Sequence, residues 1–106
     1  MNGAVAPINE RVTQAVFRAI RDVNQARPKA QQIPAAADTA LLGEGAVLDS
    51  LGLVNLIVAI EEQVADEFGT TIAIADEKAR LQPETPFRTV GTLVAYIVSL
   101  LEAQPR

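Results

Sequence analysis

The chain contains no histidine, no cysteine and no tryptophan among its 106 residues. The lack of cysteine excludes disulfide bonds and thiolate metal sites, and the additional lack of histidine argues strongly against a zinc site. A nucleophile activated by histidine is excluded as well, because a hydroxyl group attacks poorly without an adjacent base. The aromatic fraction is only 4%, so Leu, Ile, Val and Ala must build the core. Together these absences point away from self-contained covalent catalysis.

Long apolar runs are also missing. The longest uninterrupted apolar stretch is far shorter than the roughly 20 residues that a membrane-spanning helix needs. The first residues do not combine a basic segment with an apolar one, so no signal peptide is expected. The length fits one small domain over residues 1–106, with residues 1–6 frayed. We therefore expect a cytoplasmic monomer without membrane insertion.

Acidic residues are concentrated in the middle of the chain. The formal net charge is -4, and nine acidic residues from Asp38 to Glu77 occur without one Lys or Arg among them. Nucleic acid is disfavoured as a partner, because phosphate contacts require clustered basic side chains. The acidic stretch has two interpretations. It is either a solvated face that maintains solubility or a docking surface for basic partners, since complementary charge speeds encounter and sets register.

Hydrophobic periodicity predicts three substantial helices. The first spans about residues 7–25, the second about 50–68, and the last begins near Thr89, a favoured N-cap residue. A short helical turn is expected at 76–80. The connection 28–49 is unusually long, a feature that is often functional. The predicted fold is therefore all-α, a small four-helix bundle of three long helices and one short one with a long first loop. The residues expected to pin this loop to the core are Leu41, Leu42 and Val47.

Helical spacing of about 100° per residue defines the faces that should point inward. The expected core residues are Val12, Val16, Ala19, Ile20 and Val23 in the first helix, Leu53, Leu56, Ile57, Ile60, Val64 and Phe68 in the second, and Val90, Leu93, Val94, Ile97, Leu100 and Leu101 in the last. Residues 70–74 alternate weakly between polar and apolar, as in a strand, but no partner strand is evident. We expect this segment to be irregular.

The second predicted helix is apolar on more than its inward face. Leu51, Val54 and Val58 lie to one side of that face, with Glu62 among them and Glu61 at their edge. If this helix is the central one, the extra apolar residues are simply buried. If it lies at the surface, they form an exposed stripe flanked by carboxylates, which is typical of a transient protein interface. In the second case Glu61 and Glu62 face solvent.

Asp49 and Ser50 stand where a glycine-containing loop enters this helix. Asp49 is suited to cap the helix by accepting backbone N–H groups of the first turn. Ser50 would then expose its hydroxyl at the positive end of the helix dipole, which favours a phosphate group. One interpretation is that both residues only cap the helix. The other is that a separate enzyme modifies Ser50 and so supplies a reactive group that this chain lacks.

The segment LGEGAVLDSLGLVNL at 42–56 resembles the modification site of the acyl carrier protein family. The family's pattern is a glycine-containing loop, Asp-Ser-Leu, a valine soon afterwards and paired glutamates further along the helix. The similarity covers about residues 38–101, including the last helix from Thr89. It implies that Ser50 carries 4′-phosphopantetheine, with Asp49 as a supporting cap. It also implies that partner enzymes grip the second helix at Leu51, Val54, Val58, Glu61 and Glu62.

Two features depart from the family's usual pattern. Gly52 and Asn55 occupy positions where carriers of fatty acid synthesis usually have acidic residues, so partners of that pathway are less expected. The segment 75–91 is longer than the usual third-helix region. It resembles a subgroup of free-standing bacterial carrier proteins that serve dedicated pathways.

The resemblance implies a non-catalytic acyl carrier protein that presents thioester-bound intermediates in fatty acid, lipid or specialised metabolite biosynthesis. The implied partners are a phosphopantetheinyl transferase, a loading enzyme and downstream synthases with basic docking patches. An aminoacyl or peptidyl carrier, of the D-alanyl or nonribosomal type, would have the same attachment motif. Two further alternatives are an unmodified helical adaptor, in which Ser50 is only a cap, and a hydrolase using Ser50, which the missing base disfavours.

Overall fold

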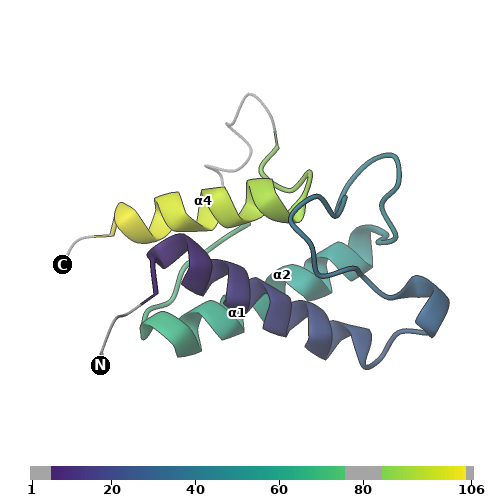
Figure 1. Ribbon diagram of the computed structural model, residues 1–106, viewed down its shortest axis with the longest axis horizontal. Coiled ribbons are helices and arrows are strands. Elements are labelled where there is room, and N and C mark those ends of the chain that lie inside the picture. The colour runs from purple at the N-terminus through teal and green to yellow at the C-terminus, as the bar shows by residue number, and fades with distance from the viewer. Residues whose placement is uncertain (1–5, 76–84, 105–106) are drawn as a thin grey trace.

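The computed structural model describes residues 6–75 and 85–104 (Figure 1). Its helices are α1 (Ile8–Asn24), the short 3₁₀ helix η1 (Lys29–Gln31), α2 (Ser50–Phe68) and α4 (Val90–Glu102). In these two ranges there is no strand, and a single antiparallel bridge pairs Ala40 with Thr89. The predicted all-α class is confirmed. The short fourth helix expected at 76–80 lies outside the described residues.

Local signals in the sequence account for the helix ends. α1 begins directly after Pro7, whose backbone is suited to a helix start. α2 ends at Gly69, which adopts the left-handed conformation with φ 67°. Thr89 caps α4, and its hydroxyl oxygen accepts from the backbone of Thr92 while the Thr92 hydroxyl accepts from the backbone of Thr89. No helix in the described part of the chain has both the length and the apolar composition to cross a bilayer.

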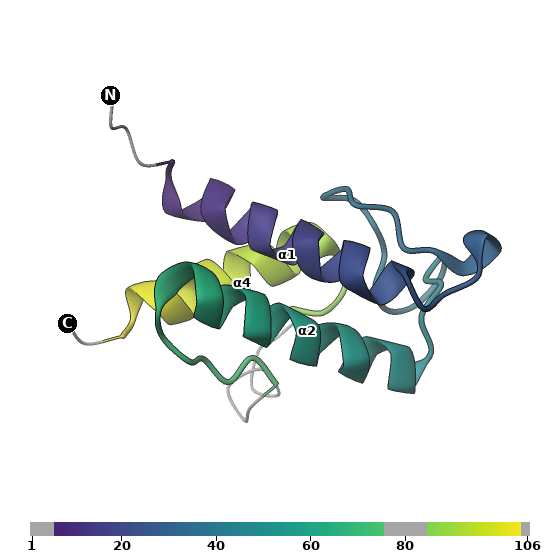
Figure 2. The ribbon, with the colours of Figure 1, turned by 90° about the horizontal axis from the view of Figure 1, so that it is seen from below.

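α1 is the central helix of the fold. It packs against both α2 and α4. Within the described residues these are the two pairs of α-helices whose backbones come close to each other. Figure 2 shows α1 and α2 running side by side, with α4 behind them. The alternative in which α2 is central and buried on every side is therefore wrong. One side of α2 packs on α1, and the opposite side is available to solvent.

The core is almost entirely aliphatic, as the composition predicts. The fully or nearly fully buried apolar residues are Val12, Ala15, Val16, Ala19, Ile20, Ile33, Leu41, Leu53, Leu56, Ile57, Ile60, Val64, Ile72, Ile74, Val90, Leu93, Val94, Tyr96 and Ile97. The predicted residues Val23, Phe68, Leu100 and Leu101 pack against this core but are only partly buried. The alternating segment after α2 forms no strand, yet it buries Ile72 and Ile74 while Thr71 and Ala73 are exposed.

Only one of the three residues predicted to pin the long loop does so. Leu41 is fully buried, whereas Leu42 is 38% exposed and Val47 is 41% exposed, so the prediction was wrong for these two. The backbone N–H groups of Leu41 and Leu42 both donate to the carbonyl of Arg88. The chain bends at this point, and Leu41 is buried while Leu42 is exposed.

Backbone hydrogen bonds fix the middle of the long loop to the start of α4. The Val90 N–H donates to the Thr39 carbonyl at 3.0 Å, and the Gly91 N–H donates to the Ala37 carbonyl at 2.8 Å. The two segments approach so closely that a Cβ on Gly91 would lie 3.1 Å from the Ala37 oxygen. Glycine is therefore the residue that permits this contact.

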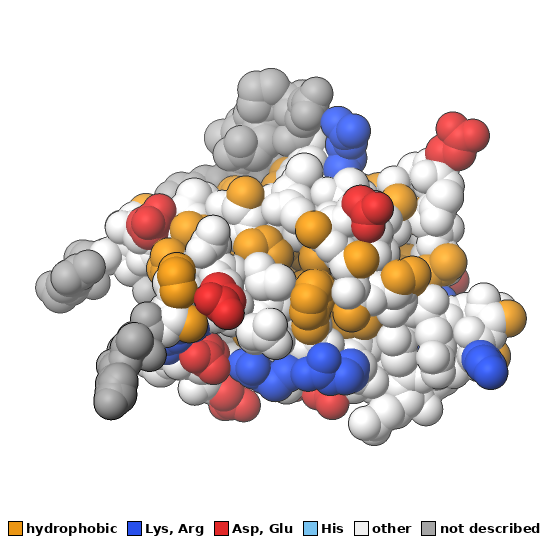
Figure 3. Space-filling model, viewed as in Figure 1, with side chains coloured by type: hydrophobic (Ala, Val, Ile, Leu, Met, Phe, Trp, Pro, Cys, Tyr) orange, Lys and Arg blue, Asp and Glu red, His pale blue; other side chains and the backbone are white. Residues whose placement is uncertain are grey.

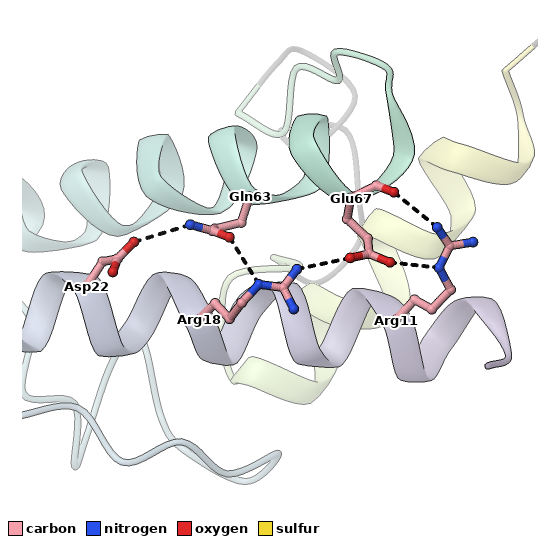
Figure 4. Close-up of polar contacts among 5 residues, drawn as sticks. All are labelled: Arg11, Arg18, Asp22, Gln63 and Glu67. Atoms are coloured by element: carbon pink, nitrogen blue, oxygen red, sulfur yellow. Dashed lines mark hydrogen bonds and ion pairs between the residues drawn. The ribbon is translucent and has the colours of Figure 1, made fainter. Parts of the chain in front are cut away.

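A polar network joins α1 to α2 along one edge of their contact (Figure 4). Arg11 Nε donates to Glu67 Oε2 at 2.9 Å, and Arg18 Nη2 donates to Glu67 Oε1 at 3.2 Å. Arg18 Nε also donates to Gln63, whose amide donates to Asp22. The two arginines therefore hold both carboxylate oxygens of one glutamate. In Figure 3, basic and acidic side chains lie next to one another along the lower edge of the view.

Arg11 adds two further contacts to the end of α2. Its Nη2 donates to the Glu67 backbone carbonyl at 3.0 Å, and its guanidinium carbon lies 4.4 Å from the centroid of the Phe68 ring. The first contact satisfies a carbonyl of the last helical turn, and the second is a cation–π interaction. The position of α1 relative to α2 is thus set by polar contacts as well as by the core.

We expect acid to weaken this α1–α2 contact. The hydrogen bond from Arg11, aided by attraction to both arginines, holds the pKa of the Glu67 carboxyl below its ordinary value of 4.5. A carboxylate with a lowered folded-state pKa stabilises the fold above its unfolded pKa, and this stabilisation is lost as the pH falls through the folded value. Glu67→Gln should therefore have a lower free energy of unfolding than the parent at neutral pH. As the pH falls into the acid range, its stability should decrease less than that of the parent. Urea unfolding from neutral pH into the acid range measures this. A pH dependence equal to that of the parent, or an equal effect of Glu62→Gln, would contradict it.

Candidate functional site

Ser50 is the first residue of α2, and its position follows from the cap before it. Asp49 has extended backbone with φ -87° and ψ -177°, and its Oδ1 accepts the Gly52 N–H at 2.7 Å. Its backbone carbonyl accepts from Leu53 at 2.9 Å, the first intrahelical bond. The prediction that Asp49 caps the helix is confirmed. Both Asp49 and Ser50 are exposed, so the Ser50 residue is open to solvent at the N-terminal end of the helix.

An exposed apolar stripe continues from Ser50 along the same side of α2. Leu51 is 68% exposed, Val54 is 55% exposed and Val58 is 48% exposed. Glu62 is exposed one turn after Val58. Within the described residues the large exposed apolar side chains are Leu42, Val47, Leu51, Val54 and Val58. All of them lie within eight positions of Ser50 in the sequence, and we call them the Ser50 apolar surface.

Glu61 does not share the environment of Glu62. It is half-buried, and its Oε2 accepts the backbone N–H of Ile74 at 2.8 Å. The prediction that both carboxylates face solvent therefore holds for Glu62 and is wrong for Glu61. The reason is the buried segment after α2, which returns along the helix and brings an N–H group within reach. Glu61 serves the fold by fixing this segment, since a part-buried N–H needs a partner.

Three neighbouring side chains crowd position 52, which bears on one departure from the acyl carrier pattern. A Cβ on Gly52 would lie 3.0 Å from Leu48 Cδ2, 3.1 Å from Asp49 Oδ1 and 3.4 Å from Arg27 Nη1. An acidic side chain has no room here without displacing these neighbours. Asn55, the other departure, is exposed, so the structure offers no packing reason for it.

The carboxylate beside Ser50 in the sequence already serves the start of α2. Asp49 is the neighbouring carboxylate, and its Oδ1 is engaged as the helix cap. Within the described ranges no three acidic side chains come together in a way that could hold a metal ion. Glu67, whose pKa is lowered, lies in the last turn of α2, at the opposite end from Ser50. Ser50 is exposed at the N-terminal end of α2, where another molecule can reach it.

Two contacts of this region were not predicted from the sequence. One is the bond from Glu61 to the Ile74 backbone, which spans 13 positions. The other is the approach of Arg27 to the loop before Ser50. In the sequence, Arg27 stands just beyond the first predicted helix, which was expected to end near residue 25. No local pattern marks either contact, since each depends on how distant segments fold back.

Comparison of the chain with protein-family profiles, with curated proteins and with solved structures gives no match. The functional argument therefore depends on the residues and geometry of the chain itself.

Substituting the two neighbouring glutamates should separate their roles. Glu61→Ala leaves the Ile74 N–H without its acceptor, and we expect a loss of about 1–3 kcal/mol in the free energy of unfolding. Glu62→Ala removes only an exposed carboxylate and should change stability by less than about 0.5 kcal/mol. Urea denaturation of both variants measures this. Glu61→Gln keeps an acceptor oxygen and should retain most of the parent stability. Equal stabilities of Glu61→Ala and Glu62→Ala would show that the Glu61 bond contributes nothing.

Proposed function

We propose that this protein is a carrier whose Ser50 is modified with 4′-phosphopantetheine and which presents acyl groups to partner enzymes. The observation that carries the proposal is the exposed Ser50 at the capped start of α2, followed on the same side by the apolar residues Leu51, Val54 and Val58. A hydroxyl group beside an exposed apolar stripe suits a site that a second protein must approach. The resemblance of residues 42–56 to the attachment motif of acyl carrier proteins supports the same interpretation.

The residues around Ser50 fit a phosphodiester. Ser50 is exposed, so a linked arm would extend into solvent without displacing the core. The N-terminal end of α2 supplies partial positive charge and backbone N–H groups, which favour a negatively charged group there. Asp49 supports the site by holding the first turn of the helix. When bound, the arm supplies a terminal thiol, which carries acyl groups as thioesters and which this cysteine-free chain lacks.

The Ser50 apolar surface and Glu62 fit a transient docking site. Exposed apolar side chains that follow one another along one side of α2 favour a protein interface, and the exposed carboxylate fits basic groups on a partner. We propose that a phosphopantetheinyl transferase, a loading enzyme and downstream synthases bind here in turn. Binding to several enzymes in turn suits a monomer in the cytoplasm. Glu61 is less suited to direct recognition, because its carboxylate is committed to the Ile74 N–H.

The cargo is an acyl group in fatty acid, lipid or specialised metabolite biosynthesis. An aminoacyl or peptidyl group is the alternative, because the attachment site is the same for both. The identity of the loading enzyme separates these cases.

Incubation with coenzyme A and a promiscuous phosphopantetheinyl transferase should add one phosphopantetheinyl group to the parent protein. Ser50→Ala should remain unmodified, because its methyl group offers no oxygen for the phosphodiester. Intact-mass measurement followed by peptide mapping locates the modification. A folded parent that gains no mass favours the unmodified adaptor, and an arm found at another residue refutes the assignment of Ser50. Hydrolysis of activated esters by unmodified protein, abolished in Ser50→Ala, would instead support a hydrolase.

Charge reversal in the proposed docking site should weaken recognition without unfolding the protein. Glu62→Lys replaces an attractive contact with a repulsive one, and we expect the rate of arm transfer at low protein concentration to fall about threefold or more. The control is Glu102→Lys, which makes the same charge change at an exposed position at the end of α4. Transfer rates measured at low and high salt test the effect, because salt screens exposed charges. Equal slowing in both variants would argue against a specific role for Glu62.

A further inference from the structure

Arg27 joins the turn after α1 to the end of η1 and to the loop before Ser50. It lies in the turn after α1, where its backbone N–H donates to the Asn24 carbonyl at 3.0 Å. Its Nε donates to the Gln31 carbonyl at the end of η1 at 2.7 Å, and its Nη2 donates to the Val47 carbonyl at 3.3 Å. Its Nη1 lies 3.4 Å from the point that a Cβ on Gly52 would occupy. Arg27 is thus bonded through its backbone to the end of α1, and its guanidinium group binds the end of η1 and the loop before Ser50 and lies close to the first turn of α2.

The loop before Ser50 has few other attachments. Val47, Asp49 and Ser50 are exposed, and Leu48 is only half-buried, so side-chain burial holds this stretch weakly. The earlier part of the long loop is fixed in a different way. Asn24 pairs through its side-chain amide with both backbone groups of Ile33, at 2.9 Å and 2.8 Å. The bond from Arg27 to the Val47 carbonyl plays the same role for the end of the loop that leads into Ser50.

These contacts depend on the shape of the arginine side chain. The guanidinium group has several N–H donors in a fixed plane, so it reaches two carbonyl oxygens in different directions while one nitrogen rests against Gly52. A lysine ammonium is a single point on a flexible stem and does not reproduce this fork. The lack of a side chain at Gly52 provides the space that Arg27 uses.

We propose that Arg27 is a positioning residue for Ser50. It fixes the Val47–Gly52 segment to the end of α1, so that the modifying enzyme meets an ordered Ser50 and does not have to order the loop when it binds. This inference rests on the proposed function, because the positioning matters for arm transfer to Ser50. Ordering a loop on binding costs conformational entropy. Loss of Arg27 should therefore raise the KM of the transferase for this protein and leave kcat nearly unchanged.

Amide hydrogen exchange of the unmodified protein tests the positioning directly. Removing a charged hydrogen-bond donor should accelerate exchange in residues 48–52 by about tenfold in Arg27→Gln, measured at the Gly52 amide, which donates to Asp49 Oδ1. Amides in the buried middle of α1 and α2 should exchange as in the parent, which shows that the fold is intact. Arg21→Gln is the matched control, because Arg21 is an exposed arginine in the last turn of α1, six positions before Arg27. Unchanged exchange at 48–52 in Arg27→Gln would overturn the proposal.

Steady-state arm transfer, with coenzyme A saturating and the carrier varied, tests the functional consequence. We expect KM to rise about tenfold in Arg27→Gln, matching the expected increase in the amide exchange rate. In Arg21→Gln, KM should stay near the parent value. Arg27→Lys should behave like Arg27→Gln, because it keeps the charge and loses the fork. A lysine variant with the parent KM, or an equal rise in Arg21→Gln, would show that charge alone matters and would refute positioning.

The two measurements also separate this inference from the proposed function. A parent protein that accepts no arm refutes the proposed function and the functional role of Arg27 together, whatever its exchange rates. A parent that is fully modified, with exchange and KM unchanged in Arg27→Gln, refutes the role of Arg27 alone.

Discussion

The packing of α1 between α2 and α4 is the constraint on which the rest of this structure depends. A small aliphatic core has few ways to bury three helices, and here α1 takes the central position. α2 is consequently covered on one side and open on the other. Ser50 and the apolar residues that follow it lie on the open side for this reason. The arrangement of the core therefore decides which part of the molecule other proteins can reach.

Polar contacts fix the parts of the chain that the core does not hold. Glu67 binds two arginines of α1, Glu61 holds the segment after α2, and Asn24 and Arg27 hold the two ends of the long loop. Each contact joins segments that are far apart in the sequence. Individually these bonds are modest, but each acts where little apolar surface is buried. The site around Ser50 thus depends on side chains outside its own helix.

The sequence was sufficient to predict what local patterns control. Helical spacing located α1, α2 and α4, and Asp49 and Thr89 were identified as caps because capping depends on residues within one turn. The exposed stripe was one of two alternatives, since periodicity shows that a second apolar side exists and not whether another helix covers it. The exposure of Leu42, the use of Glu61 and the contact of Arg27 were missed, because they depend on how loops return to the bundle.

The close approach of Gly91 to Ala37 restricts how this chain can change over evolutionary time. A methyl group at position 91 would lie 3.1 Å from the Ala37 oxygen, so the long loop would have to shift by a few tenths of an ångström to accept it. Such a shift would also strain the neighbouring bond from the Val90 N–H to the Thr39 carbonyl. A larger residue at this point would require a wider separation between the long loop and the start of α4.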